Sequence, residues 1–229
     1  MTKKDILAAA ACYGSQFVRW MDFIIDEEAS LKNGMIISEN DHDGQGVTFC
    51  GLTQASDALD LATLSPSWVA GSYFSGKIPY WKGVAGLPSP LRECVANWRV
   101  NMGLAGAARV LQSALAVRGS GIYEDGQIGP ATLLAANADA NTKALCRACV
   151  AVADAHYRAI VARIPARTYA LADWLRRDQH LLARFVDIDP TTPEDAIAVI
   201  ATPSVPRVPA PRSVAQVLND LQVTPVILT

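Results

Sequence analysis

The stretch FIIDEEASLKNGMIISENDHDGQGVTFCGLT, residues 23–53, marks the point where the N-terminal part of the chain leaves a helix for irregular structure. Apolar residues at helical spacing run through residues 4–25, and the pattern ends at the acidic cluster Asp26-Glu27-Glu28. After this cluster glycine, asparagine and aspartate replace the periodicity as far as Gly51. The sequence therefore predicts a long helix followed by a long irregular connection or a small hairpin over about residues 35–52.

Helical patterns account for most of the chain beyond this segment, as far as about residue 187. We expect helices over residues 54–64, 66–74, 90–117, 140–163 and 168–187, and a further helix that starts at about residue 131. The helix over 90–117 should be interrupted near Gly103. Ser65-Pro66 and Ser89-Pro90 each read as a capping residue before a proline in the first helical turn. Six of the thirteen prolines fall between Pro190 and Pro211, which is typical of an extended linker. The predicted fold class is all-α with a proline-rich C-terminal tail.

Composition excludes several classes of protein. Of the 229 residues 51% are hydrophobic and 18% charged, so the chain can bury a substantial core. A net charge of −2 argues against a nucleic-acid-binding protein. No apolar run approaches the roughly 18–20 residues that cross a bilayer, so no integral membrane segment is expected. The N-terminus shows no signal-peptide cleavage site, which predicts synthesis as a cytosolic protein.

The cysteines and histidines give no sign of a metal site or a redox centre. The chain has five cysteines, and Cys146 and Cys149 have CxxC spacing. A zinc site needs two more ligands at suitable spacing, which His42, His156 and His180 do not provide. Within an alanine-rich helix, positions three apart simply share a face, so we interpret the thiols as buried structural residues. No metal or cofactor is predicted.

Charge is distributed unevenly along the chain. Residues 22–60 hold nine acids and one base, whereas residues 143–184 hold eight bases and three acids. This asymmetry fits a catalytic cleft joined to a surface that holds an anionic polymer. It fits equally well with arginines that merely solvate helix faces.

The acidic cluster and the glycine-rich loop together suggest glycosidic bond cleavage. A carboxylate at the end of an apolar helix can be partly desolvated and so stay protonated as a general acid, while a second carboxylate in a polar loop stays ionised. Glycoside hydrolysis needs this division of labour. The candidates are Glu28 as the acid and Asp43 in the loop, with the Thr48 hydroxyl holding a water. On spacing alone, acids before a loop equally fit capping or solvation.

These residues resemble a known family. The run DEEAS at 26–30, followed by DGQGVTFCGLT at 43–53, resembles the N-terminal motif of family-108 glycoside hydrolases, the phage and bacterial N-acetylmuramidases, in which Glu-Gly-Gly precedes Asp-Pro-Gly-Gly-x-Thr-x-x-Gly-Ile-Thr. The alignment puts the family's catalytic glutamate on Glu28. Glu27 is a competitor for that role, because the interval to Asp43 is longer than in the family.

Further motifs follow in the family's order over residues 14–187. They are Pro79-Tyr80-Trp81, the Val100-Asn101-Met102-Gly103 helix with Leu111-Gln112, the turn Asp125-Gly126-Gln127-Ile128-Gly129-Pro130, and Asp173-Trp174-Leu175-Arg176-Arg177. The resemblance implies that the Asp125-Gly126 turn lies in a predicted peptidoglycan-binding region and that Tyr80 lies beside the cleft. Trp81, Trp98 and Trp174 are interpreted as core residues, and His156 as a packed or hydrogen-bonded histidine.

The resemblance implies a lysozyme-like helical fold in three parts. These are a catalytic region at 1–90, a helical peptidoglycan-binding region at 91–189, and a proline-rich linker and tail at 190–229. Glu28, Asp43 and Thr48 would be catalytic, whereas Tyr80, Asp125 and Gly126 would bind substrate. The alternative for Asp125 and Gly126 is a turn without ligand contact, with Gly129-Pro130 starting the next helix. The family's Glu-Gly-Gly is Glu28-Ala29-Ser30 here, and an aspartate expected before Asn101 is Asn97.

The function implied is that of an endolysin-type N-acetylmuramidase acting on bacterial peptidoglycan. It would be made in the bacterial host cytoplasm and act in the periplasm or on the cell wall. Phage or secretion-system components are candidate partners of the tail. The alternative is a non-catalytic peptidoglycan-binding or virion structural protein that keeps the fold.

Overall fold

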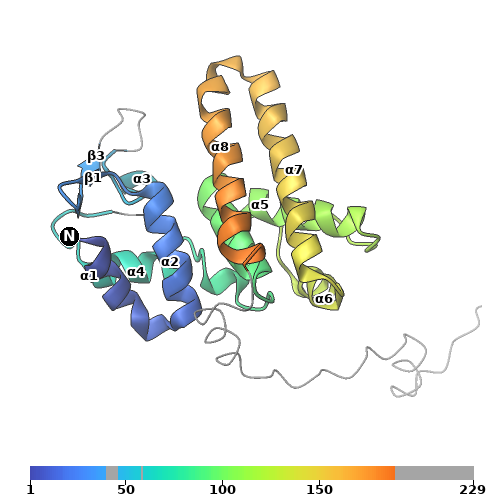
Figure 1. The fold of residues 1–229 in the computed structure, drawn as a ribbon, viewed down its shortest axis with the longest axis horizontal. Coiled ribbons are helices and arrows are strands. Elements are labelled where there is room, and N and C mark those ends of the chain that lie inside the picture. The colour runs from blue at the N-terminus through green and yellow to red at the C-terminus, as the bar shows by residue number, and fades with distance from the viewer. Residues whose placement is uncertain (40–45, 58, 189–229) are drawn as a thin grey trace, which may run out of the picture. The chain divides into compact units, whose positions relative to one another are not determined.

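The computed structural model describes residues 1–39, 46–57 and 59–188, and Figure 1 shows their arrangement. The described chain is mainly helical with small antiparallel sheets, as the sequence predicts. Asp43 and the proline-rich tail lie outside the described residues.

The N-terminal half begins with two helices where the sequence pattern predicts one. The first, α1 (Lys3–Ala10), starts with a capping box in which Thr2 and Asp5 exchange hydrogen bonds. A 3-10 turn (Ala11–Tyr13) and Gly14, with φ of 100°, separate it from α2 (Ser15–Glu28). The prediction of a continuous helix over 4–25 is therefore wrong, because this positive φ directs the chain into a turn.

Two small sheets follow α2, over the region where the sequence predicts a hairpin. Strands β1 (Leu31–Lys32) and β2 (Met35–Ile36) pair with each other. Strands β3 (Ser38–Glu39), β4 (Thr48–Phe49) and β5 (Leu52–Thr53) form an antiparallel sheet in that order. The β4–β5 turn contains Cys50 and Gly51, both with positive φ. The turn brings Gly51 back toward the end of α2.

Short helices connect the sheets to the second half of the chain. They are α3 (Gln54–Asp57), α4 (Pro66–Ser75) and a 3-10 turn (Lys82–Val84). The helix expected over residues 54–64 is wrong for residues 59–64, because Asp60 accepts hydrogen bonds from Ala62 N and Thr63 N in a turn. Ser65 caps α4 as predicted, its hydroxyl accepting from Trp68 N at 3.1 Å. The corresponding expectation at Ser89 is wrong: Pro90 is the N-cap residue of the next helix, and the Ser89 hydroxyl instead donates to Glu93.

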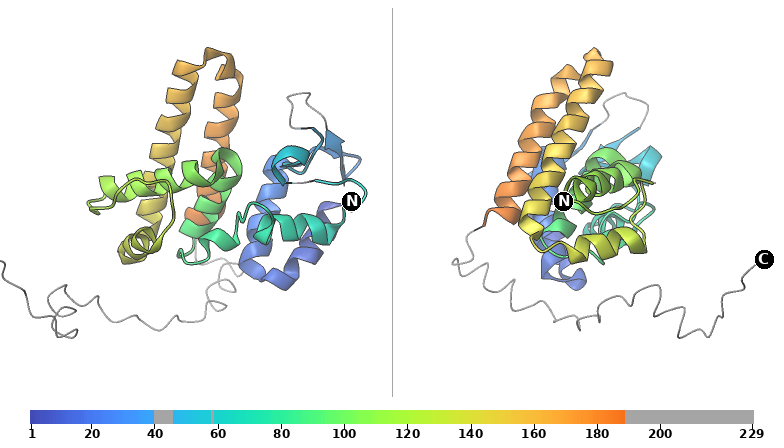
Figure 2. Two further views of the ribbon diagram at one scale, coloured as in Figure 1. Left: turned by 180° about the vertical axis from the view of Figure 1, so that it is seen from behind. Right: turned by 90° about the vertical axis from the view of Figure 1, so that its right-hand side faces the viewer.

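The second half is a helical layer built on α5 (Leu91–Val117). Gly103, with φ of 76° and ψ of 174°, interrupts α5 at the predicted place. After α6 (Pro130–Ala138), the long helices α7 (Thr142–Arg163) and α8 (Thr168–Leu181) form a hairpin through a 3-10 turn (Pro165–Arg167), and a π-helical turn (Leu182–Val186) ends the described chain. Helix α7 packs on both α5 and α8, and Figure 2 shows this layer from behind and from the side.

Buried aromatic residues and thiols fill the core of the described chain. Trp20, Trp81 and Trp98 are all buried, which confirms that Trp81 and Trp98 are core residues. Trp174 is only half-buried and packs against the edge of the core, so its interpretation as a core residue is wrong. The thiols are reduced, and all except Cys12 are buried, in agreement with a structural role. The interpretation of His156 is wrong, because its side chain is exposed on α7.

Helix α5 is long and apolar enough to cross a membrane by length and composition alone. Its break at Gly103 and the packing of its buried residues against α7 identify it as a core helix of this body.

Candidate active site

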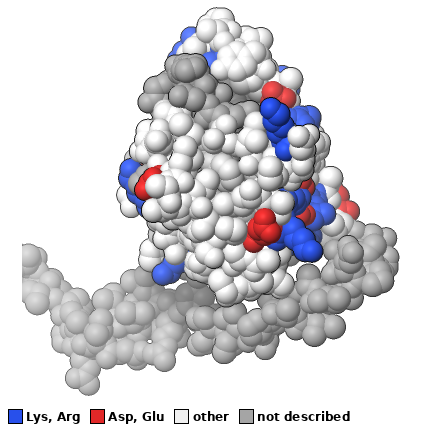
Figure 3. All heavy atoms as spheres, turned by 90° about the vertical axis from the view of Figure 1, so that its left-hand side faces the viewer, with Lys and Arg blue, Asp and Glu red and all other residues white. Residues whose placement is uncertain are grey.

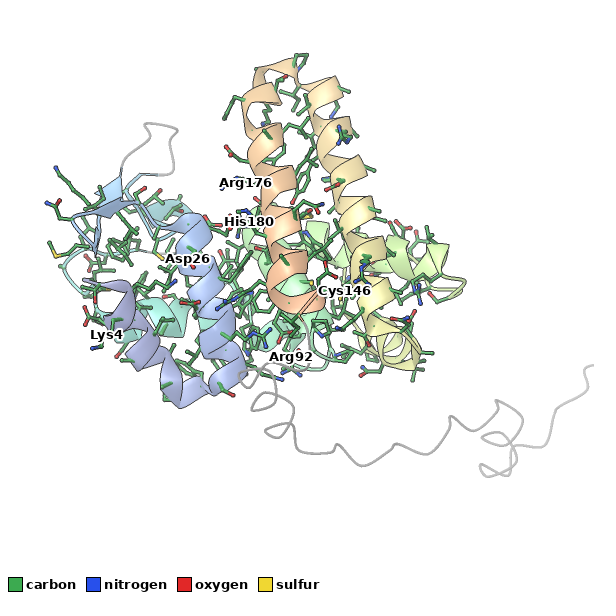
Figure 4. The ribbon with its side chains drawn as sticks, in the orientation of Figure 1. Lys4, Asp26, Arg92, Cys146, Arg176 and His180 are labelled. Atoms are coloured by element: carbon green, nitrogen blue, oxygen red, sulfur yellow. The ribbon has the colours of Figure 1, made fainter. Side chains whose placement is uncertain are left out.

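A small polar cavity of about 240 Å³ lies where the end of α2 meets α8 and the N-terminal part of α5. It is lined by Glu27, Glu28, Gly51, Val100, Asn101, Asp173, Trp174, Arg176 and Arg177. Residues from both halves of the sequence therefore form its walls. In Figure 4 the labelled side chains of Arg176 and His180 extend from α8 toward α2.

Glu28 is the last residue of α2, and its carboxylate faces this cavity. Its side chain is 20% exposed, whereas that of Arg177 is 8% exposed. Arg177 Nη1 donates to Glu28 Oε1, and Arg177 Nε donates to Asn97 Oδ1 at 2.8 Å. Within the described part of the chain Glu28 Oε2 accepts no hydrogen bond. One oxygen of Glu28 is thus held by α8, whereas the other carries no hydrogen bond from a described residue.

The β4–β5 turn closes the opposite side of Glu28. A Cβ carbon built on Gly51 would lie 2.8 Å from Glu28 Oε2 and 2.9 Å from the Tyr73 hydroxyl, so only glycine fits this approach. The Tyr73 hydroxyl donates to the Cys50 carbonyl at 2.6 Å and fixes the turn. Burial, with a contribution from the Glu28 charge, raises the pKa of the Cys50 thiol to about 12. The turn therefore presents no charged group to Glu28 near neutral pH.

Glu27, the competing candidate, also lines the cavity but has a different partner. Its Oε1 lies 2.8 Å from His180 Nδ1, and its side chain is 9% exposed. Glu28, and not Glu27, contacts the turn that contains Gly51. This difference favours Glu28 as the acid of the motif.

Ion pairs join the acids of α2 to bases from other helices. Asp22 pairs with Arg184 and Lys3, and Lys3 also reaches Asp26. Beside these pairs lies a second, wider cavity of about 480 Å³ that shares Glu27 and Arg176 with the first. On the face shown in Figure 3, most of the surface is uncharged, and several Lys or Arg side chains lie directly beside Asp or Glu side chains. The acidic and basic segments of the sequence thus partly neutralise each other.

The other predicted catalytic residues are not brought to Glu28 by the described structure. Thr48 lies half-buried on β4, three residues before Gly51, and it is not among the residues that line the cavity. Asp43 lies outside the described residues. Their catalytic roles stay predictions.

Tyr80 is buried near the site and is engaged with another residue. Its side chain is 6% exposed, and its hydroxyl donates to Asp57 Oδ1 at 3.0 Å. Burial, and then the charge of Asp57, raises the pKa of Tyr80. The hydrogen bond ties Tyr80 to Asp57 at the end of α3. Contact between Tyr80 and substrate stays a prediction.

Asp125 and Gly126 form a turn that is folded onto Gln112 of α5. Gln112 Nε2 donates to Asp125 Oδ1 at 2.7 Å, and Gly126 N donates to Gln112 Oε1 at 2.9 Å. These bonds, and one from Gln127 N, lower the pKa of Asp125. Neither residue lines the cavity at Glu28. Substrate binding by this turn stays a prediction.

Several residues of the cavity belong to sequence motifs for which the sequence predicts no catalytic role. Arg177 closes the Trp-Leu-x-Arg motif, and Asn101 belongs to the Val-Asn-x-Gly motif. Asn101 Nδ2 donates to the Tyr157 hydroxyl at 2.6 Å, and the Tyr157 ring stacks on Trp174 with centroids 5.1 Å apart. The late motifs therefore build a wall of the same cavity that Glu28 faces. Among the described residues no group of three or more His, Cys, Asp or Glu side chains could hold a metal ion.

Comparisons with known proteins concern the second half of the chain and the fold. The signature of a family described as "Predicted Peptidoglycan domain" matches residues 106–179, from the second part of α5 to most of α8. Among solved structures, the chain is similar to SagA of Brucella abortus, with a TM-score of 0.56 and 20% identity over 77% of this chain and 98% of that one. At this identity the likeness shows a shared fold. No curated protein sequence matches the chain.

Proposed function

We propose that this protein is a peptidoglycan hydrolase of the N-acetylmuramidase type, which cleaves the β-1,4 bond between N-acetylmuramic acid and N-acetylglucosamine. The observation that carries the proposal is the contact between Glu28 and Gly51. Both residues belong to the motif that resembles the muramidase family, and they meet in a polar cavity whose other wall includes residues of the segment that matches a peptidoglycan domain.

In this reaction Glu28 donates a proton to the oxygen of the leaving sugar as the glycosidic bond breaks. Asp43 activates a water or stabilises the positive charge that develops on the sugar ring, and Thr48 helps to hold that water. The chemistry needs carboxylates and water, so it proceeds without a cofactor or metal. The proposed sites of action are the periplasm and the cell wall, with phage or secretion-system components as candidate partners.

One observation favours a non-catalytic peptidoglycan-binding or virion structural protein instead. Glu28 Oε1 is held by Arg177, and an ion pair of this kind can serve packing alone. The two functions differ in turnover, so a cleavage assay separates them.

The test is digestion of purified sacculi by the full-length protein, followed by borohydride reduction and mass spectrometry of the fragments. A muramidase leaves N-acetylmuramic acid at the new reducing end. Glu28→Gln should lower the rate by about 10²–10⁴-fold, because a general acid contributes about that much. The unfolding free energy should fall by about 1–3 kcal/mol, because Arg177 loses its anionic partner.

Glu27→Gln is the matched control, since it changes a neighbouring carboxylate of the same cavity. Loss of activity in Glu27→Gln with retention in Glu28→Gln would move the acid to Glu27. Binding of sacculi by the wild-type protein without any new reducing ends would establish the non-catalytic alternative.

A further inference from the structure

The guanidinium of Arg177 is buried between Glu28 and Asn97. It comes from α8, 149 residues after Glu28 in the sequence, and its side chain is 8% exposed. Its Nη1 donates to Glu28 and its Nε to Asn97 Oδ1. A buried, bonded guanidinium has few rotamers available, so it fixes the position of the carboxylate that it contacts.

Two donors in this cluster have no acceptor. Arg177 Nη2 and Asn97 Nδ2 are both buried and carry no hydrogen bond within the described chain. A neutral amide at position 97 therefore accepts one bond from the guanidinium but supplies no negative charge to it. Glu28 is the one carboxylate that hydrogen-bonds Arg177 in the part of the chain that the structure describes.

Asp178, next to Arg177 on α8, is a carboxyl whose pKa burial raises to about 7 and the charge of Arg177 lowers in part. Other titratable groups lie around Glu28. They are Glu27 on α2, Asp173 and Arg176 on α8, Cys50 in the β4–β5 turn, Tyr73 on α4 and Tyr80 after it. Asp173 and Arg176 pair with each other, and Glu27 pairs with His180. Burial raises the pKa of Cys50 and of both tyrosines, so these three groups are neutral near pH 7.

We propose that Arg177 is a positioning residue for Glu28: its buried guanidinium, held in turn by Asn97, fixes the orientation in which the Glu28 carboxylate faces the cavity. The inference rests on the proposed function. It assigns to the C-terminal half a direct part in the catalytic cavity in addition to holding the polymer.

The test compares full-length wild-type protein with Arg177→Gln and Asn97→Asp. Rates on a soluble muropeptide are measured from about pH 4 to 9, giving kcat and KM separately. The titration of Glu28 is followed independently by NMR of carboxyl-¹³C-labelled glutamate, with Glu28→Gln used to assign the signal. Arg147→Gln is the control, because it removes an arginine of α7 whose partner, Asp187, lies outside the cavity.

For Arg177→Gln we expect kcat to fall about 10–100-fold with KM within about twofold, because the acid loses its fixed position. The alkaline limb of the rate profile should move to higher pH, which a merely structural role would not cause, because a carboxylate without a cationic neighbour keeps its proton to higher pH. Arg177→Lys, which keeps the charge but not the fork of donors, should lose kcat while its alkaline limb stays near that of the wild type.

For Asn97→Asp the new carboxylate can accept from both Nε and Nη2 of Arg177 and neutralise it. We expect the alkaline limb of the rate profile and the NMR titration of Glu28 to move to higher pH, with the maximal kcat within about twofold.

The inference would be overturned if the alkaline limb of the rate profile and the NMR titration of Glu28 stay unchanged in the folded variants Arg177→Gln and Asn97→Asp. If Asn97→Asp fails to fold, Arg177→Gln decides alone. If the wild-type protein cleaves nothing but the Glu28 titration moves as expected, the proposed function fails and the pairing stands.

Discussion

Gly51 and Glu28 approach each other so closely that a Cβ carbon on Gly51 would lie 2.8 Å from Glu28 Oε2 and 3.0 Å from Glu28 Cβ. The neighbour on the other side is the hydroxyl of Tyr73, which is fully buried. Neither neighbour can move without disturbing the hydrogen bond from Tyr73 to Cys50 or the ion pair from Glu28 to Arg177. The absence of a side chain at Gly51 therefore determines where the Glu28 carboxylate lies.

Gly51→Ala should abolish cleavage of sacculi by displacing Glu28. The unfolding free energy should also fall, by about 1–2 kcal/mol from the positive φ alone. Gly34→Ala is a matched control, because Gly34 has the same φ of +75° but nothing within 4 Å of its added carbon. Gly34→Ala should thus lose similar stability and keep its activity. Equal activity in the two variants, measured by reducing-end release, would contradict the steric argument.

Asp178 should make the protein less stable as the pH rises from about 4 to about 7. Burial raises the pKa of this carboxyl to about 7, while Trp98 Nε1 donates to Oδ1 at 3.0 Å and Oδ2 has no partner. The folded protein then holds a proton that the unfolded chain has already released, so the unfolding free energy falls across this interval. The effect is on the order of a few kcal/mol.

Asp178→Asn keeps the acceptor for Trp98 and removes the titration. Its unfolding free energy, measured by urea at several pH values, should lack the part of the fall that Asp178 causes. Asp173→Asn, an exposed carboxylate of the same helix, should follow the wild-type pH dependence. A wild-type and an Asp178→Asn curve that run parallel from pH 4 to 7 would show that Asp178 is already ionised in the folded protein.

Local patterns predicted the elements of this fold better than the contacts between them. Ser65-Pro66 begins a helix and Gly103 interrupts another, because capping and positive φ are properties of a few adjacent residues. The break at Gly14 was missed, because one glycine within an apolar helical pattern is often tolerated.

In the candidate site, too, local patterns predict single residues but not the contacts between distant ones. Glu28 could be proposed from its place at the end of an apolar helix and from the motif around it. Its partner Arg177 could not, because no spacing rule relates residues that are 149 positions apart. The signal that existed was the late Trp-Leu-x-Arg motif, whose arginine was interpreted as part of a binding region.

Gln112 should stabilise the Asp125-Gly126 turn without taking part in cleavage. Its side chain is buried and bonds both residues of the turn, together with Thr132. Gln112→Ala should lower the unfolding free energy by about 1–3 kcal/mol, since the turn loses its buried partners. The rate on a soluble muropeptide should stay near that of the wild type.

Asp125→Asn separates the structural role from substrate binding. If the turn only packs on α5, cosedimentation with sacculi should be unchanged at a temperature where the variant is folded. Weaker cosedimentation of the folded variant would instead support the predicted contact of Asp125 with the polymer.

Binding to sacculi should depend on salt through the end of the α7–α8 hairpin. Of the bases in residues 143–184, Arg147, Arg176, Arg177 and Arg184 are already paired with acids. The other four are exposed and form no ion pair with a described residue: Lys143 at the start of α7, and Arg158, Arg163 and Arg167 toward the other end of the hairpin. The positive charge that is free to meet a polymer is therefore concentrated near the hairpin end, at the top of Figure 1.

Peptidoglycan carries peptide carboxylates, so its attraction to these arginines should be screened over about 8–10 Å at physiological salt. Cosedimentation should weaken as salt rises from low concentration to roughly 0.5 M. Replacing Arg158, Arg163 and Arg167 by glutamine should weaken it at low salt and leave turnover of a soluble muropeptide unchanged. The matched control replaces three exposed lysines of the N-terminal half, Lys4, Lys32 and Lys82, by glutamine. Equal losses of binding in the two triple variants would mean that net charge, and not the hairpin end, attracts the polymer. Binding that does not change with salt concentration would mean that the cavity recognises the polymer by shape and hydrogen bonding.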